Sequence, residues 1–325
     1  MAYAPVAVIA LLMGLVPLLR GDSPRTFMGL ATTVVVFACY ATAFNIIFGS
    51  TGQLFLCLGA LAGVAGYGTA IFTDRLGWPA VVAVVVATAA SALLGALFSW
   101  VSVRRSLDVI FTGIVTLAFS LGFGNLLLGQ RDLTGGETGI VIDTGEGTLL
   151  RDLVPAYYVF LALLVVFLVG FRWLQRSHFG WAFRALKDDE MTAELAGVNV
   201  ARYRIWAGGI GSAMLGLTGA LYTLHEGFIS PSTFAFAHVD VRTLVMLAFG
   251  GIGTLVGPVI GAVSFGLIDE ALRGLGQLRV AVYGAILVAL FLGFRQGVGP
   301  AVVKVLKRMG GRRTQTRASQ PPPKR

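Results

Sequence analysis

The sequence predicts an all-α, polytopic helical membrane protein. Hydrophobic residues make up 56% of its 325 positions, charged residues only 13%, and the mean hydropathy is +0.81. Apolar runs of roughly 20 residues recur from one end to the other and lack the alternation of a barrel strand. Backbone groups inside hydrocarbon must pair within their own segment, so runs of this length indicate transmembrane helices.

About ten spans are expected, with boundaries accurate to a few residues. They lie near residues 4–19, 28–48, 54–72, 79–101, 107–128, 156–173, 203–222 and 279–294, together with a glycine-broken region at 242–272 that makes two short spans. The first run has no positive charge before it, so we interpret it as a span and not as a signal peptide. Residues 1–308 are expected to form one transmembrane domain, and the basic, Pro-rich residues 309–325 a disordered tail.

The distribution of basic residues predicts the orientation. If both termini lie on one side, that side holds most of the 25 Lys and Arg residues, including Arg104, Arg105, the group at 172–204 and those from 295 onward. The positive-inside rule then places both termini in the cytoplasm. The net charge of +9 is thus a topology signal and not evidence for nucleic-acid binding, and the basic tail is expected to touch anionic membrane lipid.

A short charged segment, LKDDEMTAELAGVNVARYR, interrupts the apolar pattern within a cytoplasmic loop at residues 174–202. Asp188 and Asp189 suit a helix N-terminus, and Gly197 suits a C-terminal stop. A helix of about two turns is therefore expected between them.

The expected helix has one apolar face. Met191 and Leu195 are four residues apart and share it, whereas Thr192 and Glu194 lie away from it. Such a face needs a partner, and these residues leave two candidates open: the lipid headgroups, or a soluble subunit of a larger assembly.

The same segment carries a resemblance to a known family. SHFGWAFRALKDDEMTAELAGVNVARYR resembles the cytoplasmic coupling segment of the branched-chain amino-acid ABC permeases of the LivM type. Further matches follow in the family's order: FNIIFGSTGQLFLCLGALAGVAGYGTAI, GIVTLAFS, LTGGETGI, GALYTLHEGFISPSTFAF and LVMLAFGGIGTLVGPVIGA. Each motif alone is weak, but together, between Ala41 and Lys307, they are highly specific.

The resemblance implies a coupling role for this loop. The loop resembles the EAA-xxx-G element of ABC importers, with Gly197 as its glycine and Met191, Thr192 and Ala193 in place of the EAA triplet. The acidic residue of the triplet stands one position early, so either Glu190 or Glu194 meets the ATPase. The residues implied at this contact are Asp188, Asp189, Glu190, Met191, Ala193, Glu194, Leu195 and Gly197.

The resemblance also implies one subunit of an importer in the bacterial cytoplasmic (inner) membrane. A second, LivH-like permease subunit, two ATPase subunits and an extracytoplasmic solute-binding protein would complete the assembly. The sequence independently lacks a G-x-x-x-x-G-K-[ST] phosphate loop. ATP hydrolysis is therefore assigned to other chains, and neither enzymatic activity nor a cofactor is expected of this one.

The solute is not identified by any residue of this chain. Members of the family are associated with leucine, isoleucine and valine, and their relatives also serve urea, amides and aromatic compounds. Selectivity in such importers lies largely in the separate binding protein. Branched-chain amino acids are the expected cargo, with urea, an amide or another small polar solute as the alternative.

Two glycine-rich breaks, FGSTGQ and FGGIGTLVGP, interrupt the third and eighth of the ten expected spans. These places correspond if the chain is a 5+5 inverted repeat, and interrupted helices at corresponding places point to a transport path. The residues expected on the path are Thr51, Gly52, Gln53, Gly250, Gly251 and Gly253. Freed amides and the Gln53 side chain would contact a zwitterionic solute, although loop turns and packing breaks explain the same glycines.

Small residues also repeat every four positions along two of the spans. One stripe comprises Gly208, Ser212, Gly216 and Ala220, and the other comprises Gly253, Gly257 and Gly261. Both stripes allow helices to approach closely, either inside this chain or against the second permease.

Other classes of function find little support in the sequence. No Asp or Glu falls in the middle of an expected span, which argues against an ion-coupled secondary transporter. His178, His225 and His238 lie near span ends, and their spacing fits neither a metal site nor a membrane-embedded enzyme. Cys39 and Cys57 lie inside apolar runs and are expected to be small buried hydrophobes.

The predicted topology can be tested by cysteine labelling. A cysteine introduced at Ser319 should react only from the cytoplasm, whereas one at Thr138 should react with impermeant reagents from outside, because the basic residues favour the cytoplasmic side. Labelling of position 319 from outside would overturn the orientation.

Overall fold

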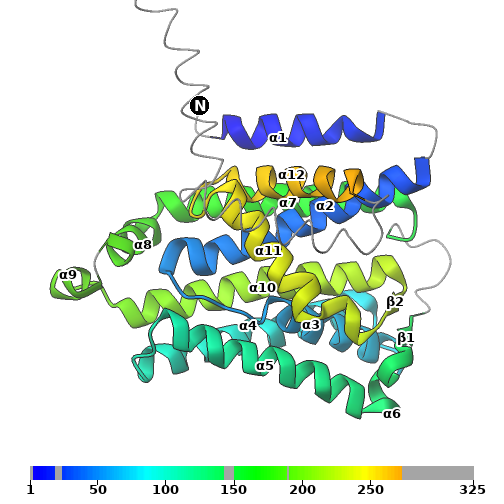
Figure 1. Ribbon diagram of the computed structural model, residues 1–325, viewed down its shortest axis with the longest axis horizontal. Coiled ribbons are helices and arrows are strands. Elements are labelled where there is room, and N and C mark those ends of the chain that lie inside the picture. The colour runs from blue at the N-terminus through cyan, green and yellow to red at the C-terminus, as the bar shows by residue number, and fades with distance from the viewer. Residues whose placement is uncertain (1–2, 19–23, 143–149, 189, 273–325) are drawn as a thin grey trace, which may run out of the picture.

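The computed structural model describes residues 3–18, 24–142, 150–188 and 190–272, which form a bundle of long helices (Figure 1). The elements in chain order are α1 (Ala4–Gly14), η1 (Val16–Leu18), α2 (Pro24–Phe44), the π-helical turn η2 (Asn45–Gly49), α3 (Leu58–Asp74), α4 (Ala80–Arg104), α5 (Val109–Gly129), α6 (Arg131–Thr134), η3 (Gly136–Thr138), β1 (Ile140–Val141), α7 (Leu153–Arg176), α8 (His178–Asp188), α9 (Glu190–Leu195), α10 (Val200–Glu226), β2 (Phe228–Ile229), η4 (Pro231–Phe234), α11 (Phe236–Gly250) and α12 (Gly257–Ala271).

Six helical stretches in the described part of the chain are long and apolar enough to cross a membrane. They are Thr26–Gly49, Ala80–Arg104, Val109–Gly129, Leu153–Arg176, Val200–Glu226 and Pro231–Gly250. The predicted fold of membrane-spanning helices is therefore confirmed for these residues. The expected span at 279–294 and the expected tail at 309–325 lie outside the described residues, and the total of about ten spans and the inverted repeat stay predictions.

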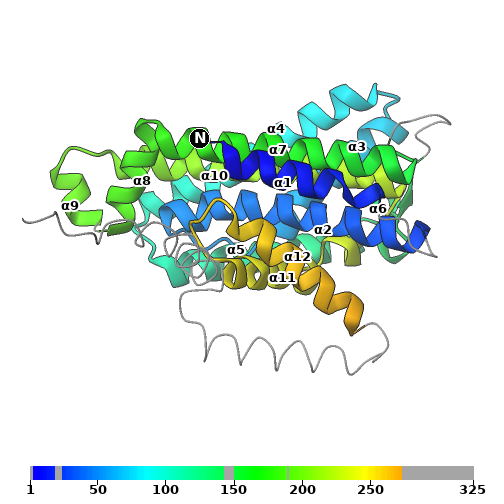
Figure 2. The same ribbon diagram turned by 90° about the horizontal axis from the view of Figure 1, so that it is seen from above.

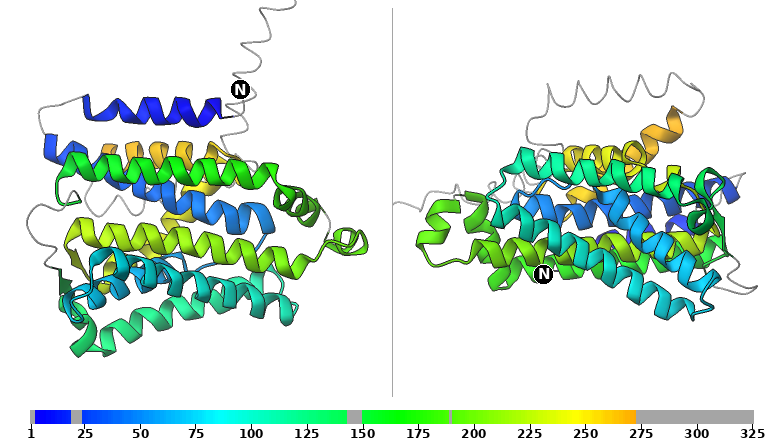
Figure 3. Two further views of the ribbon diagram at one scale, coloured as in Figure 1. Left: turned by 180° about the vertical axis from the view of Figure 1, so that it is seen from behind. Right: turned by 90° about the horizontal axis from the view of Figure 1, so that it is seen from below.

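The helices lie roughly along one common direction. α1 runs along one edge of the bundle and α5 along the opposite edge, with α10 between them (Figures 1 and 3). α8 and α9 project at one end, near the start of α1, and α6 lies at the other end (Figure 2). At that second end β1 pairs antiparallel with β2, with Ile140 opposite Ile229, which ties the loop after α6 to the end of α10.

On α4, large apolar side chains face outward and mostly small or polar ones face inward, which is an arrangement expected of a helix that packs in lipid. On α4, Val81 and Leu93 are 75% and 71% exposed. The buried residues of the same helix are Ala83, Val84, Ala87, Ser91, Gly95, Ser99 and Ser102, and all but Val84 are small. Because hydrocarbon solvates the outer side chains, helix association depends on how closely the small residues let the backbones approach.

α4 and α10 approach each other closely. Ser91 Oγ donates a hydrogen bond to the carbonyl oxygen of Ser212 at 2.9 Å. A Cβ on Gly95 would lie 2.7 Å from the carbonyl oxygen of Gly208, and one on Gly216 would lie 2.7 Å from Ser91 Cβ. The sequence allowed the small-residue stripe on α10 to pack either inside this chain or against a second permease. In the structure it packs inside this chain.

The second stripe also packs internally. A Cβ on Gly261 would lie 2.7 Å from the carbonyl carbon of Met246, so α12 rests directly on α11 at this point. Of the other two members, Gly257 begins α12 and Gly253 lies in the loop before it. Residues 242–272 contain two helices, as predicted, with α11 beginning earlier, at Phe236. Of the two, α11 belongs to a described stretch long and apolar enough to cross a membrane, and a second span here stays a prediction.

The close approach of α4 and α10 predicts the effect of adding one methyl group. Gly95→Ala should lower the free energy of unfolding by about 1–3 kcal/mol, because its new methyl would collide with backbone atoms of α10. Gly170→Ala in α7 is the matched control, since a Cβ there meets nothing within 4 Å. Equal thermal unfolding midpoints of the two purified variants in detergent would contradict the packing described here.

Candidate functional site

The two glycine-rich breaks predicted from the sequence lie against each other. Asn45, in η2 at the end of α2, accepts a hydrogen bond through Oδ1 from the Gly253 amide at 2.7 Å. Its Nδ2 donates to the carbonyl oxygen of Thr254 at 2.8 Å. A Cβ on Gly49 would lie 2.9 Å from the Gly253 nitrogen, so a side chain larger than hydrogen would push the two breaks apart.

The chain after the first break is extended and not helical. The span expected from residue 54 begins as a helix only at Leu58, because Gly52 adopts a φ of +72° and turns the chain out of α2. The buried backbone between the two helices is satisfied by side chains: the Leu56 amide donates to Thr116 Oγ1 of α5 at 2.9 Å. α2 and α3 together therefore make one discontinuous helix pair with irregular backbone inside the bundle.

Gln53 carries a polar group that the fold leaves unsatisfied. Its side chain is only 3% exposed, and its Oε1 accepts a hydrogen bond from Ser99 Oγ at 3.1 Å. Its Nε2 is buried and finds no acceptor among the described residues. A buried amide without a partner costs free energy, so this nitrogen is a hydrogen-bond donor that the described part of the fold does not use.

The start of α3 is held by a buried carboxylate. Asp240 of α11 is 1% exposed, and its two oxygens accept hydrogen bonds from the amides of Leu58 and Gly59 at 2.5 and 3.0 Å. These two amides are among those that the start of a helix leaves without intrahelical partners. The expectation that no Asp or Glu lies inside a span was wrong, because α11 begins before Asp240 and encloses it.

The remaining residues expected on the path lie partly at the two breaks and partly at the contact between α11 and α12. Thr51 is 4% exposed and donates through Oγ1 to the carbonyl oxygen of Ile47 at 2.6 Å. Gly250 packs against α12, where a Cβ would lie 3.0 Å from the Gly261 nitrogen. Gly251 ends α11 with a φ of +108°. The structure thus brings Gly253 to the first break, whereas Gly250 belongs to the α11–α12 contact.

The charged segment carries two described helices, one on either side of residue 189. α8 covers His178–Asp188, and α9 comprises the six residues Glu190–Leu195, which include Met191. Asp188 therefore belongs to a helix that begins at His178 instead of opening one, and Asp189 lies outside the described residues. The reason is the apolar pattern of α8: Ala182, Phe183 and Leu186 are buried, so tertiary packing carries that helix past the predicted start.

Gly197 ends α9 as predicted. It adopts a φ of +83°, its amide donates to the carbonyl oxygen of Glu194 at 2.9 Å, and the Val198 amide donates to that of Ala193 at 3.0 Å. This pair of bonds is a Schellman motif. Ala193 is 3% exposed, whereas Leu195 is 85% exposed, so α9 presents a large apolar side chain away from the bundle.

An aromatic cluster fixes α8 to the rest of the molecule. Phe179 and Phe183 pack edge to face on the Tyr203 ring, with centroids 5.4 and 6.2 Å apart. Tyr203 lies in the first turns of α10, the helix that is joined to α4. The cluster therefore joins α8 to the helix that packs on α4.

A polar cavity of about 530 Å³ lies between the breaks and α8. We call it the basic cavity; the residues lining it include Ser50, Arg172, Gln175, Arg176, Arg184 and Gly253. Gln175 Nε2 donates to the carbonyl oxygen of Gly253 at 3.4 Å. The cavity thus connects the second break with the element that carries the charged segment.

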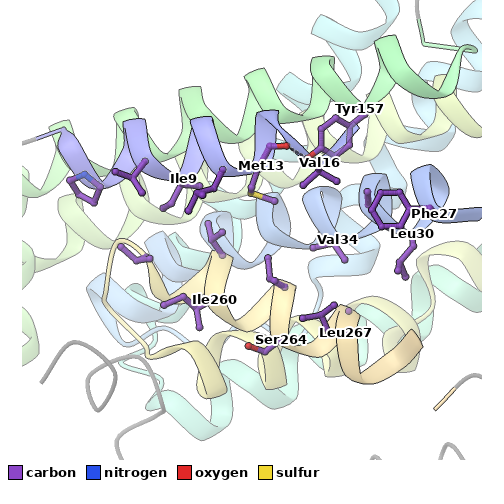
Figure 4. Close-up of a pocket in the computed structure, with 18 residues that line it drawn as sticks. Ile9, Met13, Val16, Phe27, Leu30, Val34, Tyr157, Ile260, Ser264 and Leu267 are labelled. Carbon is purple, nitrogen blue, oxygen red and sulfur yellow. Dashed lines mark hydrogen bonds between the residues drawn. The ribbon is translucent and has the colours of Figure 1, made fainter. Parts of the chain in front are cut away.

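A second cavity is almost entirely apolar. It has a volume of about 690 Å³ and lies between α1, α2 and α12 (Figure 4). Met13, Val34 and Ile260 are among the side chains that line it, and the Tyr157 hydroxyl at its margin is already used as a donor to the carbonyl oxygen of Met13 at 2.6 Å. Its lining suits hydrocarbon and offers little to a charged solute.

The expected absence of metal chemistry was based on histidine spacing. Among the described residues, no three His, Cys, Asp or Glu side chains gather where they could hold a metal. His225 instead contacts the carbonyl oxygen of Leu150 through Nδ1 at 2.6 Å. Cys39 and Cys57 are buried and unpaired.

Sequence reasoning missed Asn45, Asp240 and Arg172. Asn45 lies inside an apolar run, and a single polar residue there was the available signal. Asp240 stands at the edge of a run, where a short error in the predicted boundary hid it. Arg172 was counted only as a topology signal, although its Nε is buried in the structure.

Comparison with known proteins places these features in a family. A model of the family described as "Branched-chain amino acid transport system / permease component" matches residues 26–293. The high-affinity branched-chain amino acid transport system permease protein LivM of Salmonella typhimurium is 25% identical over 88% of this chain and 73% of its own length. LivM of Escherichia coli is 26% identical over the same shares.

A sugar permease is also similar. The fructose import permease protein FrcC of Rhizobium meliloti is 26% identical over 70% of this chain and 65% of its own length. No solved structure matches the chain significantly.

The hydrogen bonds of Asn45 predict a measurable loss. Asn45→Ala should lower the free energy of unfolding by about 1–3 kcal/mol, since it leaves the Gly253 amide and the Thr254 carbonyl unpaired where the two breaks meet. Asn125→Ala, at an exposed asparagine of α5, is the control. Thermal unfolding in detergent compares the two, and an unchanged midpoint for Asn45→Ala would show that the breaks do not depend on this side chain.

Proposed function

The chain belongs to the family of branched-chain amino acid transport system permease components, and on this basis we propose that it is the transmembrane subunit of an ATP-driven importer of branched-chain amino acids. The observation that carries the proposal is the meeting of the two broken helices at Asn45, next to the unsatisfied Gln53 amide. Discontinuous helices with freed polar groups are the usual form of a transport site within a membrane.

The transport path in this proposal follows the extended segment between α2 and α3. The proposal places Thr51, Gly52 and Gln53 on one side of this path and Gly251 and Gly253 on the other, and among their side-chain polar atoms Gln53 Nε2 is the one without a hydrogen-bond partner in the described part of the chain. These groups offer few and weak contacts, which suits a subunit that must release its cargo. Asp240 is already engaged by the start of α3, so its presence inside a span does not by itself favour an ion-coupled carrier.

The proposed partners follow from the family. A second permease of the LivH-like type, two ATPase subunits and an extracytoplasmic solute-binding protein complete the importer in the bacterial inner membrane, with both termini and the α8–α9 element in the cytoplasm. ATPase closure moves α8, the aromatic cluster passes the movement to α10, and α10 moves α3 and the path beside it. The acidic residues Asp188, Asp189, Glu190 and Glu194 and the side chains of Met191 and Leu195 are the proposed ATPase contacts.

Branched-chain amino acids are the proposed solute class because the family description and the two LivM relatives name them. The fructose permease covers a smaller share of this chain, 70% against 88%, which is why a sugar is not preferred. Urea, an amide or another small polar solute remains the alternative cargo. Purification of the neighbouring solute-binding protein and measurement of its ligand would decide among them.

The docking of α9 on an ATPase makes a direct prediction. Leu195→Asp should abolish co-purification of the co-expressed ATPase subunits of the importer, because it buries a charge without a counter-ion against the partner, at a cost of several kcal/mol. Leu195→Met keeps an apolar side chain of similar volume and should retain them. Full retention of the ATPase by Leu195→Asp would instead support a helix that rests on lipid headgroups.

Gly197 gives an independent variant pair for the same assay. A Cβ there meets nothing within 4 Å, so substitutions differ only in how well they tolerate the φ of +83°. Gly197→Val should lose the ATPase, whereas Gly197→Asn should keep most of it, since asparagine tolerates left-handed backbone and a β-branched residue does not. If both variants retained the ATPase equally, docking would not depend on the Schellman turn at Gly197.

A further inference from the structure

We propose that the basic cavity is a binding site for the phosphate of an anionic phospholipid. The site adjoins the proposed path at Gly253 and is separate from the exposed face of α9. Three arginines line it, Arg172 and Arg176 from the end of α7 and Arg184 from α8, and no carboxylate is among its lining residues. A cavity of one sign of charge in a low-dielectric surrounding attracts a counter-ion of the other sign.

The arginines retain donors for such a ligand. Arg172 reaches only Gln175 Oε1, at 3.3 Å, and its buried Nε has no hydrogen-bond partner in the described part of the chain. Arg184 uses Nε for the carbonyl oxygen of Gly180 at 3.1 Å, which leaves its two terminal nitrogens. A guanidinium carries five N–H donors in a planar fork that matches the oxygens of a phosphate.

The remaining contacts of these side chains are with aromatic rings. The guanidinium of Arg184 lies 4.8 Å from the centroid of Trp181, and that of Arg176 lies 5.8 Å from the centroid of Tyr3. Both contacts orient the charge without neutralising it. An occupant with negative charge would therefore meet three guanidinium groups that no described carboxylate has already paired.

The depth of the cavity favours a lipid over a soluble anion. It lies where the apolar helix α7 ends, and Trp173 and Trp181 beside it are 61% and 70% exposed. Exposed tryptophans at the end of a span mark the headgroup level of a bilayer. Basic pockets between transmembrane helices at this level bind lipid headgroups.

The position of the site gives its occupant a role. Phe183 and Gly253 both line the cavity, the first on the coupling helix α8 and the second on the break that Asn45 holds. A bound phosphate would bridge α7 and α8 beside that break. The lipid would thus hold α8 at a fixed distance from the path in the absence of any soluble partner.

Native mass spectrometry of the full-length chain tests the proposal. The chain is reconstituted in bilayers of phosphatidylcholine and phosphatidylglycerol, extracted in mild detergent, and weighed with the lipids it keeps. We expect one phosphatidylglycerol to be retained in preference to phosphatidylcholine, and Arg172→Gln to weaken this retention about tenfold, as the loss of a charge-assisted hydrogen bond predicts.

A matched control separates the cavity from general surface charge. Arg104, at the end of α4, lies 5.1 Å from the centroid of Trp100 and so resembles Arg184 in its ring contact, but it lies outside the cavity. Arg184→Gln should weaken phosphatidylglycerol retention, and Arg104→Gln should not. Equal losses in these two variants, or unchanged retention in Arg172→Gln, would overturn the proposal.

The source of the phosphate is tested by competition. Inorganic phosphate and water-soluble glycerol 3-phosphate are added at millimolar concentration to the extracted complex. If either displaces the lipid completely, the site is one for soluble anions and the lipid assignment is wrong; persistence of the lipid supports it. Thermal unfolding of each variant in lipid-free detergent should match the parent chain, and a variant that fails this check is replaced by the corresponding Arg→Lys change, for which weaker but measurable retention is expected.

Discussion

Every backbone amide and carbonyl inside a bilayer has to find a partner within the protein, and this requirement is hardest to meet between Gly52 and Cys57, where the chain leaves the helical conformation. The bundle meets it with side chains from distant elements. Thr116 accepts a hydrogen bond from the Leu56 amide, and Asp240 accepts hydrogen bonds from the first amides of α3. Asn45 accepts one from the Gly253 amide in the opposite break. These few polar contacts make irregular backbone possible in this position, and the candidate path exists because of them.

The same polar contacts determine how the helices are ordered in space. α11 has to cross the bundle close to the start of α3, because its carboxylate caps that helix. α5 has to lie beside the extended segment, because it supplies the Thr116 hydroxyl. The small inner faces of α4 and α10 then allow the remaining helices to close around these fixed points. Apolar packing fills the bundle, but the polar anchors decide which helices are neighbours.

How much of this could be predicted depended on the kind of signal. Long apolar runs predicted most helices well, since hydropathy over a span is a strong average. Gly197 was predicted as a helix end because a left-handed position favours glycine. The non-helical conformation of Leu54–Cys57 could not be predicted, since its apolar residues suit a helix as well as a non-helical segment. The conformation depends on contacts with residues far away in the sequence. Asp188 was misplaced for a related reason: the buried aromatic residues of α8 outweigh the local preference of an aspartate for a helix start.

The contact between α4 and α10 limits how the molecule can change shape. Backbone atoms on both helices touch through Gly95 and Gly208, and Ser91 bonds across the gap, so neither helix can slide along the other without a collision. This pair, with α3 packed on it, therefore behaves as a rigid body. A change of shape in which α10 moves would therefore carry α4 and α3 with it as one unit, and the relative movement would fall at the borders of this unit with the other helices.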